Sequence, residues 1–365
     1  MPQIVYIDIT TTAAETPNNL QEMGAIVSFG GSTLTTGTFQ ELTGVADYTA
    51  IATAASGDAY RQVNNFYQQG NGVVYLLELG ADGTATSDLN TYIQANPQTF
   101  YAFDLPSKCL DEAGFADMLK NYVNQNSKTY FFADGTEAQE LALGTNKCMW
   151  VATPSPTADA TEYASSHVFY EWINANPTSA KKLAPFAFRY MYGLTPWPEK
   201  GNKATFNRLK AENINFIATG AQGGVSTDLL FWGYFMDGKP MSYWYAVDWV
   251  QIHLAQDLAY EIITGSNSTT APLIYDQRGI TRLQARAVTT LDTGTSFGCI
   301  VGTPAVSAVD YGTYVTENPG DYSTGTYNGL SATITPMRGF EQITFYLNVD
   351  FSGAAAITTT TTTGS

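Results

Sequence analysis

Charged residues and cysteines are scarce in this sequence. Charged residues occupy 14% of its 365 positions, whereas roughly 25% is usual for soluble domains. The three cysteines, Cys109, Cys148 and Cys299, lie far apart and show no CxxC spacing. This pattern is typical of free thiols in a reducing compartment, and it indicates neither a disulfide framework nor a zinc site.

Positive charge and long apolar runs are scarce too. The 17 Lys and Arg residues face 33 Asp and Glu residues, which gives a net charge of −16. Nucleic acids and anionic membranes both attract a positive surface, so neither is an expected partner. No run of about 18 apolar residues occurs, and the first residues do not have the pattern of a secretion signal. We therefore expect a soluble protein that is made in the cytoplasm.

Motifs for catalysis or cofactor binding are missing. The glycines at 220–224 follow a predicted strand but lack the GxGxxG spacing of dinucleotide sites and the Lys-Ser/Thr pair of a P-loop. No GxSxG motif occurs, and the two histidines, His167 and His253, have no identifiable catalytic partner. Three carboxylates are interpreted as helix-start and turn residues: Asp111, Glu112 and Asp134. We predict no enzymatic activity, cofactor or metal, although sequence alone leaves a Ser/His/Asp or Cys/His site open.

Aromatic residues, by contrast, are abundant. They make up 13% of the chain, and 23 of them are tyrosines. A chain that is poor in charge and rich in Tyr and Thr is expected to have much of its surface covered by other molecules. The length exceeds one average domain and is sufficient for two domains, each with its own core.

The first half of the chain alternates predicted strands and helices. Apolar runs predict strands at 25–29, 73–79, 99–103, 129–132, 147–151 and 214–218. Between them, helices are predicted at 58–69, 88–95, 112–124, 136–143, 161–175 and 204–212. This spacing favours parallel βα units in one sheet, which the strand at 214–218 is expected to close. Asp237-Gly238 then predicts a hairpin between 229–236 and 241–245.

A long helix is predicted at 246–263, with two apolar stripes on roughly opposite sides. The first stripe contains Val247, Val250, Leu254 and Leu258, and the second contains Trp249, Ile252, Tyr260 and Ile263. A helix with two apolar faces is expected to be sandwiched between other elements. We therefore expect Trp249, Leu254 and Leu258 to be core residues.

A second amphipathic helix is predicted at 276–291. Its apolar face contains Ile280, Leu283, Ala287 and Leu291. The opposite face has three arginines at four-residue intervals: Arg278, Arg282 and Arg286. This stripe is the most concentrated positive feature of an acidic chain, so it is a candidate contact for an acidic partner or, alternatively, a solvated helix face.

Both ends of the chain have the alternating pattern of β-strands. In the first strand Val5, Ile7 and Ile9 face one way, and the polar segment 10–19 can span up to about 33 Å as a tether. In the last strand, 342–351, the residues that share a face include Ile343, Phe345, Leu347 and Val349. Such strands could add to the sheets of neighbouring copies and build a mesh. Segment 311–328 is expected to be flexible, and the Thr-rich end to be disordered.

A family resemblance follows from the central stretch. The sequence Tyr-Ala-Val-Asp-Trp-Val-Gln-Ile-His-Leu at 245–254, the turn with Pro272, the segment 275–280 and a second helix ending near Gly294 resemble the C-terminal core domain of contractile bacteriophage tail sheath proteins. The resemblance implies a non-enzymatic subunit that forms stacked hexameric rings around a tail tube and contracts to drive the tube through the host envelope. It also implies tube, baseplate and tail terminator proteins as partners, and a location in the phage tail after assembly in the cytoplasm of the host bacterium.

The expected fold is therefore α/β, with a parallel βα-type sheet domain, a C-terminal α+β core domain and extended terminal strand arms. The predicted divisions are an N-terminal arm and tether at 1–20, an α/β domain at 21–228, the core domain at 229–340, a strand arm at 341–357 and a Thr-rich tail at 358–365. By analogy, the arginine stripe is a candidate tube or neighbour contact. The alternatives are a tube or baseplate component, for which a smaller and mostly β chain is expected, or an α/β enzyme with an unrecognised site.

Overall fold

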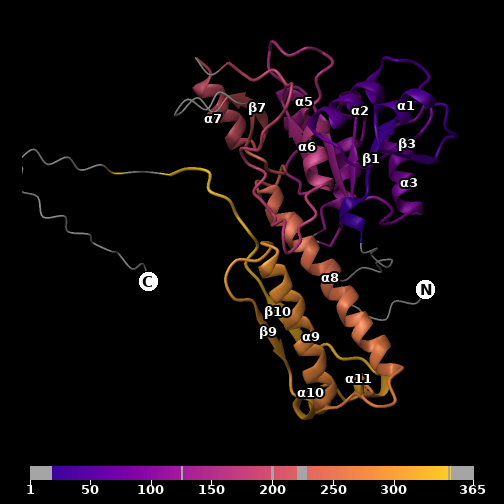
Figure 1. Ribbon diagram of the computed structural model, residues 1–365, viewed down its shortest axis with the longest axis vertical. Helices are drawn as coiled ribbons and strands as arrows, with labels where there is room; N and C mark the ends of the chain where they lie inside the picture. The colour runs from indigo at the N-terminus through magenta and orange to yellow at the C-terminus, as the bar shows by residue number, and fades with distance from the viewer. Residues whose placement is uncertain (1–18, 125, 199–200, 220–227, 344–345, 347–365) are drawn as a thin grey trace, which may run out of the picture.

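The computed structural model describes residues 19–124, 126–198, 201–219, 228–343 and 346. It has two parts, an α/β body and an elongated stalk, which the long helix α8 (Met241–Ser266) joins (Figure 1). Within the described residues, no helix combines the length and hydrophobicity that a membrane span requires.

A six-stranded sheet forms the centre of the body, in the order β2-β3-β1-β4-β5-β6. Its strands are β1 (Gly24–Ser28), β2 (Phe39–Leu42), β3 (Val74–Glu78), β4 (Ala102–Asp104), β5 (Tyr130–Asp134) and β6 (Met149–Ala152). All neighbours are parallel except the edge strand β2, which runs antiparallel to β3. Four of the strands are buried along their whole length, which explains why the sequence shows continuous apolar runs there. The predicted parallel sheet is confirmed.

Helices cover both faces of this sheet. Alternate strand residues face two cores: Ile26 and Phe132 lie in one, whereas Val27 and Phe131 lie in the other. The helices of the body are α1 (Val45–Ile51), α2 (Asp58–Gln69), α3 (Asn90–Ala95), α4 (Phe115–Leu119), α5 (Glu137–Ala142), α6 (Ala164–Ile173) and α7 (Lys203–Ala211). Short helical turns lie at Leu20–Glu22, Ala85–Leu89, Ser107–Asp111 and Lys120–Tyr122.

The prediction that the strand at 214–218 closes the main sheet is wrong. Strand β7 (Phe216–Thr219) pairs antiparallel with β8 (Asp228–Phe231) in a separate two-stranded sheet. A single parallel bridge from Ala152 to Asn215 connects this small sheet to β6. The buried Asn215 side-chain amide donates hydrogen bonds to the carbonyls of Val151 and Tyr234. These side-chain hydrogen bonds replace backbone pairing at the place where the strand pairing ends.

The hairpin predicted around Asp237-Gly238 is also wrong. The turn exists, but the second arm is the start of α8, which begins after Pro240. Met241, Trp244 and Tyr245 are buried at helical spacing, which favours a helix over a strand here. Helix α8 therefore starts before the predicted residue 246, and it continues through Gly265.

The stalk is a helical hairpin covered by a small sheet and two short helices. Helix α9 (Gln277–Ser296) begins within one residue of the predicted start and extends beyond the predicted end at 291. Asp276 is its N-cap, because the Asp276 carboxylate accepts a hydrogen bond from the Gly279 N–H at 2.9 Å. It runs antiparallel to α8, since successive contacts link Glu261 with Arg282, Asp257 with Arg286 and Trp249 with Gly294. Strands β9 (Ala305–Ala308) and β10 (Leu330–Thr333) pair antiparallel, and β9 lies against α9.

Segment 311–328, which the sequence predicts to be flexible, is instead ordered. It contains α10 (Tyr311–Glu317) and α11 (Pro319–Thr324). A group of tyrosine rings with neighbouring centroids 4.7 to 6.3 Å apart holds it to the start of α9: Tyr275, Tyr311, Tyr314, Tyr322 and Tyr327. These aromatic contacts stabilise a polar segment that has no strong local pattern of its own.

Candidate assembly surfaces

At the junction of body and stalk, a buried polar cluster of Asp248, Tyr101 and Tyr130 joins α8 to the sheet. We call this cluster the Asp248 seat. Asp248 is fully buried and accepts hydrogen bonds from the hydroxyls of Tyr101 at 2.9 Å and Tyr130 at 2.7 Å. Both tyrosines lie at the amino ends of strands, next to β4 and in β5. Burial raises the pKa of Asp248, while the nearby charges of Lys147 and Lys128 act in the opposite direction. The seat thus fixes where α8 meets the sheet.

Aromatic rings enclose this seat. The Trp172 ring of α6 is stacked parallel to Tyr101 at 5.4 Å and meets Tyr245 edge-on at 5.1 Å. Phe235 contacts Trp172 at 5.2 Å and Tyr130 at 4.9 Å. Because close-packed aromatic cores deform little, the first turns of α8 and the sheet form one rigid unit.

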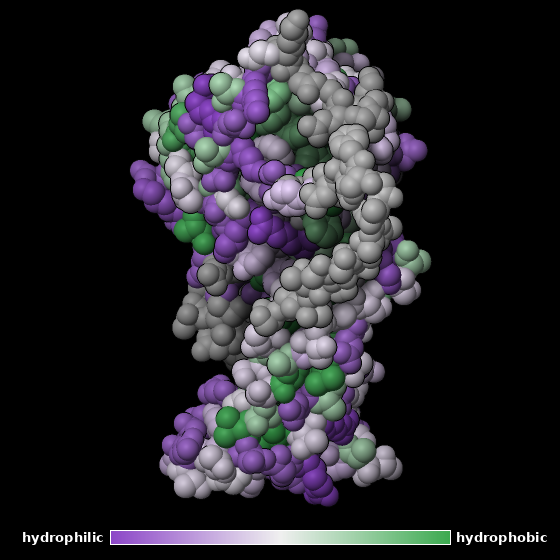
Figure 2. Space-filling model, turned by 90° about the vertical axis from the view of Figure 1, so that its left-hand side faces the viewer, coloured by the Kyte–Doolittle hydropathy of each residue, from purple (hydrophilic) through white to green (hydrophobic). Residues whose placement is uncertain are grey.

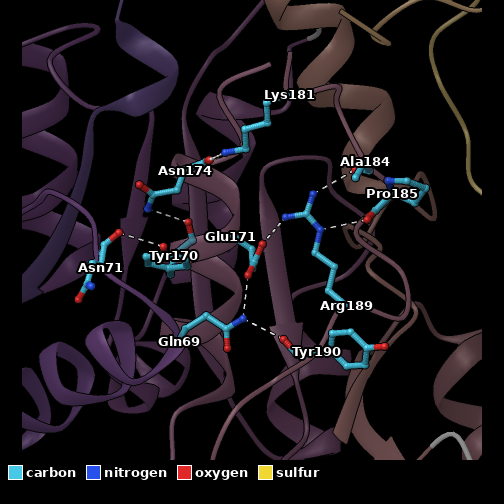
Figure 3. A network of polar contacts seen from close by, with 10 residues as sticks. All are labelled: Gln69, Asn71, Tyr170, Glu171, Asn174, Lys181, Ala184, Pro185, Arg189 and Tyr190. Carbon is cyan, nitrogen blue, oxygen red and sulfur yellow. Dashed lines mark hydrogen bonds and ion pairs between the residues drawn. The ribbon is translucent and has the colours of Figure 1, made fainter. Parts of the chain in front are cut away.

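A second polar network holds residues 184–190, which follow α6 in the sequence, against the body (Figure 3). Glu171 of α6 forms an ion pair with Arg189 and accepts a hydrogen bond from Gln69 of α2 at 2.7 Å. Arg189 also donates to the carbonyls of Pro185 and Ala184, at 3.0 and 3.1 Å. Burial lowers the pKa of Arg189, and the Glu171 carboxylate opposes that shift. The network therefore ties residues 184–190 to two helices of the body.

The predicted core residues of α8 lie at the junction and along the stalk. Trp249 is 3% exposed, Leu258 is 8% exposed and Leu254 is half-buried. Trp249 packs on Phe297, and a Cβ added at Gly294 would lie 2.9 Å from its ring. Close approach of α9 to α8 therefore requires glycine at position 294.

The sandwiched helix predicted for 246–263 is correct only for its first half. Beyond Ile252, α8 packs against α9 and against Leu273 in the following loop, and Tyr260 and Ile263 of the second stripe are 60% and 44% exposed. Ile274 in the loop after α8 is 51% exposed. Hydrophobic surface of this kind is visible on the stalk below the body in Figure 2. The stalk therefore presents apolar side chains that the described part of the chain leaves uncovered.

The three arginines of the predicted stripe have different surroundings. Arg282 pairs with Glu261 and Arg286 pairs with Asp257, so both charges are offset by carboxylates of α8. The Arg278 side chain is 86% exposed and contacts Asp276 at 3.0 Å. Contact with a tube or neighbour stays a prediction, and the exposed Arg278 is the member that is most available for it.

Most residues of the two predicted strand arms lie outside the described residues. These are Val5, Ile7, Ile9, Phe345, Leu347 and Val349, and the Thr-rich end lies there too. Ile343 is described; it is 81% exposed and has no strand partner. The two arms therefore stay predictions.

The β9–β10 sheet is a candidate acceptor for such arms. Ala308 pairs with Leu330 and Ala305 with Thr333, and in the described part of the chain no third strand extends either edge. Two-stranded sheets are only marginally stable alone, and open edges present unpaired N–H and C=O groups. This sheet is therefore suited to the addition of a strand on either side.

The histidines have structural contacts. The His167 ring is fully buried, with Nδ1 and Nε2 each 2.9 Å from a backbone carbonyl, those of Tyr163 and Tyr192. Burial lowers its pKa. His253 is stacked on Trp249, and its Nδ1 lies 2.8 Å from the Trp249 carbonyl. The glycines at 220–224 lie outside the described residues.

Sequence reasoning missed a buried acidic pair at the carboxyl ends of β4 and β5. Asp134 is the last residue of β5, not a turn residue, and accepts a hydrogen bond from the Ser165 N–H at 3.0 Å. Asp104 accepts from the Ser166 hydroxyl at 2.5 Å. Burial raises the pKa of Asp104 to about 7 and that of Asp134 to about 8. Both are at most 4% exposed, so no substrate reaches them in this conformation.

The other two carboxylates that were interpreted as helix-start or turn residues have different surroundings. Asp111 closes a short helical turn and accepts a hydrogen bond from the Gln139 side chain at 2.6 Å. Glu112 accepts from the N–H groups of Ala85 and Thr86, at 3.0 and 2.8 Å. Glu112 thus caps the helical turn at Ala85–Leu89, which is distant in the sequence, and does not cap the helix that was predicted to begin at residue 112.

No protein-family model matches the sequence, and no curated protein matches it. Solved structures do. A chain of the anti-feeding prophage baseplate has 14% sequence identity and a TM-score of 0.68 over 96% of this chain and 99% of that chain. The anti-feeding prophage helical sheath in its contracted state has 14% identity and a TM-score of 0.62 over 95% and 98%. The sheath tail protein from Desulfitobacterium hafniense has 9% identity and a TM-score of 0.52 over 83% and 93%.

The chain has the fold of the contractile tail sheath proteins. This likeness extends over the body and the stalk, and it confirms the resemblance seen in the central stretch of the sequence. With identities of 9 to 14%, the fold is what these structures share with the chain.

Proposed function

We propose that the protein is a structural subunit of the sheath of a contractile injection system, such as a phage tail. The observation that carries the proposal is the match to the contracted anti-feeding prophage sheath, which covers 95% of this chain and 98% of that one. The chain thus has a counterpart for nearly every part of a sheath structure. In this function it needs no catalytic residue, cofactor or metal.

In the proposed assembly, copies form stacked six-membered rings that surround a tail tube. The arms at 1–20 and 341–357 leave the α/β domain (21–228) and the core domain (229–340) and add to the β9–β10 edges of neighbouring copies. The open edges of that sheet support this mode of linkage, because main-chain pairing is largely independent of sequence. The Thr-rich residues 358–365 have no assigned part in it.

Contraction, in this proposal, is a rigid-body rotation of each subunit. The close packing around Asp248 supports it, because a body that is fixed to α8 moves as one piece. The tether at 10–19 absorbs the motion while strand pairing persists, and the tube is driven through the host envelope.

The proposed partners are other copies of this chain, the tube protein, and baseplate and tail terminator proteins. Arg278 is the proposed contact to the tube or a neighbour. The location is the phage tail, after assembly in the host bacterial cytoplasm. Neither nucleic acid nor a membrane is a proposed partner.

A baseplate-associated component is the second candidate. The neighbour with a TM-score of 0.68 comes from a six-fold symmetrised baseplate structure. The two candidates differ in extent, because a sheath subunit polymerises into long cylinders whereas a baseplate component stops at a ring.

Negative-stain microscopy of the purified full chain tests the proposal. Cylinders with stacked rings support the sheath, and single rings support the baseplate candidate. A chain that stays monomeric at all concentrations contradicts both. Deletion of residues 1–18 or 342–365, which spares the buried Leu20 and the Glu341 ion pairs, is expected to abolish cylinders while the thermal unfolding of the body is unchanged.

A further inference from the structure

Asp104 and Asp134 are the last residues of two neighbouring parallel strands, β4 and β5. Asp104 pairs in register with Phe132, and Asp134 lies two residues further along, so both carboxyls point to the same face of the sheet as Phe132. That face packs against α2 and α6. The topology thus brings the two acids together at one edge of the sheet, beneath two helices.

These two helices supply neutral polar side chains to the same place. Ser165 and Ser166 of α6 donate to Asp134 and Asp104, as described above. Gln62 of α2 is fully buried and lies close enough to Asp104 to lower the pKa of that carboxyl. Within the described residues, however, neither Oε1 nor Nε2 of Gln62 makes a hydrogen bond, and Asp104 Oδ1 and Ser165 Oγ make none either. Buried polar atoms without partners are unfavourable, so this group indicates an occupant that would satisfy them.

The cluster also lacks positive charge. Glu140 of α5 is a third fully buried carboxyl, and the charges that act most strongly on Asp134 and Glu140 come from other carboxylates. Among the ion pairs of the described residues, none includes Asp104, Asp134 or Glu140. The N-terminus of α6 offers only about half a positive charge. Because buried charges are normally paired or bound to a metal, the cluster is suited to a cation.

The donor atoms select the kind of cation. All of them are oxygens, which favour hard cations over transition metals. No place in the described part of the chain gathers three His, Cys, Asp or Glu side chains as a metal site would, so neutral oxygens have to complete the set. Two carboxylates balance a divalent ion. Ca²⁺ binds about six to eight oxygens, amide oxygens included, whereas Mg²⁺ usually keeps several waters, for which a buried site is less suited.

We propose that Asp104, Asp134 and Gln62 bind a Ca²⁺ ion at the carboxyl ends of β4 and β5. The ion enters while the body folds, since both aspartates are at most 4% exposed in the folded chain. Once bound, it links the sheet to α2 and stabilises the body. The sequence predicts no metal because the ligands come from three separate elements. This inference does not depend on assembly or on the proposed sheath function.

Refolding of the full chain in millimolar CaCl₂ or in EDTA, at about pH 8 where protons compete least, tests the site. The measurements are the metal content of the desalted protein, by mass spectrometry of the elements, and the midpoint of thermal unfolding. We expect one calcium per chain. The midpoint should be about 5 °C higher with Ca²⁺ than with EDTA, the scale for a ligand about 100-fold above its Kd.

Two variants locate the ion. Asp104→Asn keeps an acceptor for the Ser166 hydroxyl, and Gln62→Met removes an amide that makes no hydrogen bond, so both are expected to fold. Each should weaken calcium binding at least tenfold and remove most of the shift in the midpoint. Asp117→Asn, which removes the same charge from an exposed site, is the matched control and should keep the full shift. It distinguishes the site from general attraction of Ca²⁺ to an acidic chain.

The proposal is overturned if wild-type protein refolded with Ca²⁺ contains no calcium and unfolds at the same temperature as the EDTA sample; the cluster then holds protons only. An equal calcium response in wild type and Asp104→Asn would place the ion elsewhere and also overturn the site. Equal stabilisation by Mg²⁺ would overturn the choice of Ca²⁺. None of these results bears on the sheath function, which microscopy tests separately.

Discussion

Replacement of Asp134 by Asn is expected to stabilise the body at pH 8 and to reduce the pH dependence of its stability. In the folded chain, burial raises the pKa of Asp134 to about 8 and that of Asp104 to about 7, from an ordinary value of 3.8. Between about pH 4 and pH 8 the folded state therefore binds more protons than the unfolded state. Stability therefore falls as the pH rises from about 4 to 8, and it levels off above that.

The magnitude follows from the size of the shift. At about 1.4 kcal/mol per pKa unit, a shift of about four units corresponds to a ceiling of about 6 kcal/mol for Asp134. That ceiling is comparable with the whole stability of many domains, and structural relaxation around the charge will reduce it. We expect Asp134→Asn to recover about 2 to 4 kcal/mol at pH 8. Asn keeps an acceptor for the Ser165 N–H.

The assay is urea unfolding of unassembled protein at a series of pH values. The window from pH 6.5 to 8 is the informative one, because the buried, neutral His167 destabilises the fold as the pH falls below 6.5, which opposes the carboxylate effect there. Asp117→Asn serves as the control, since the pKa of this exposed carboxyl is lowered by Lys120. Equal pH slopes in wild type and Asp134→Asn, or a loss of stability in the variant at pH 8, would refute the reasoning.

Three further substitutions, and one control, test the stalk. Gly294→Val places a side chain against the Trp249 ring and is expected to lower the free energy of unfolding by about 1 to 3 kcal/mol, measured by thermal unfolding. The control is Gly312→Ala in α10, where the added Cβ meets no atom within 4 Å and stability should be unchanged or slightly higher. Equal effects of the two substitutions would contradict the close contact between α8 and α9. Arg286→Ala removes a half-buried ion pair with α8 and should cost about 0.5 to 1 kcal/mol in the same assay. Arg278→Glu should leave stability unchanged and weaken binding to tube or neighbour in a sedimentation assay; unaltered assembly and contraction would exclude it as a contact.

Local patterns were sufficient to predict the parallel sheet. Continuous apolar runs such as Phe131-Phe132 are typical of strands that are buried on both faces, and the intervening helices require parallel neighbours. The edge strand β2 was missed because only one of its four residues is buried and the strand shows no such run. The start of α8 was missed because Asp237-Gly238 gives a strong local turn signal, whereas the helix at Met241 depends on burial of Trp244 and Tyr245 by distant residues.

Long-range contacts explain the other differences. Asp104 and Asp134 are thirty positions apart, and only the parallel pairing of β4 with β5 brings their carboxylates to one edge. Tyr275 meets Tyr322 and Tyr327 through the fold of the stalk, so the order of 311–328 has no local signal. Arg282 and Arg286 lie on one helix face as predicted, but sequence could not reveal that Glu261 and Asp257 on α8 neutralise them.

The uninterrupted length of α8 gives the molecule a mechanical property. From the Asp248 seat to Ser266 the axis rises about 27 Å without a break, so a tilt of about 10° at the sheet displaces the far end by roughly 5 Å. By its geometry the helix is a lever arm, because a small change of its angle at the sheet becomes a displacement of its far end of about one helical turn. If the proposed rotation of subunits occurs, the stiffness of this helix determines how much of that displacement reaches its end.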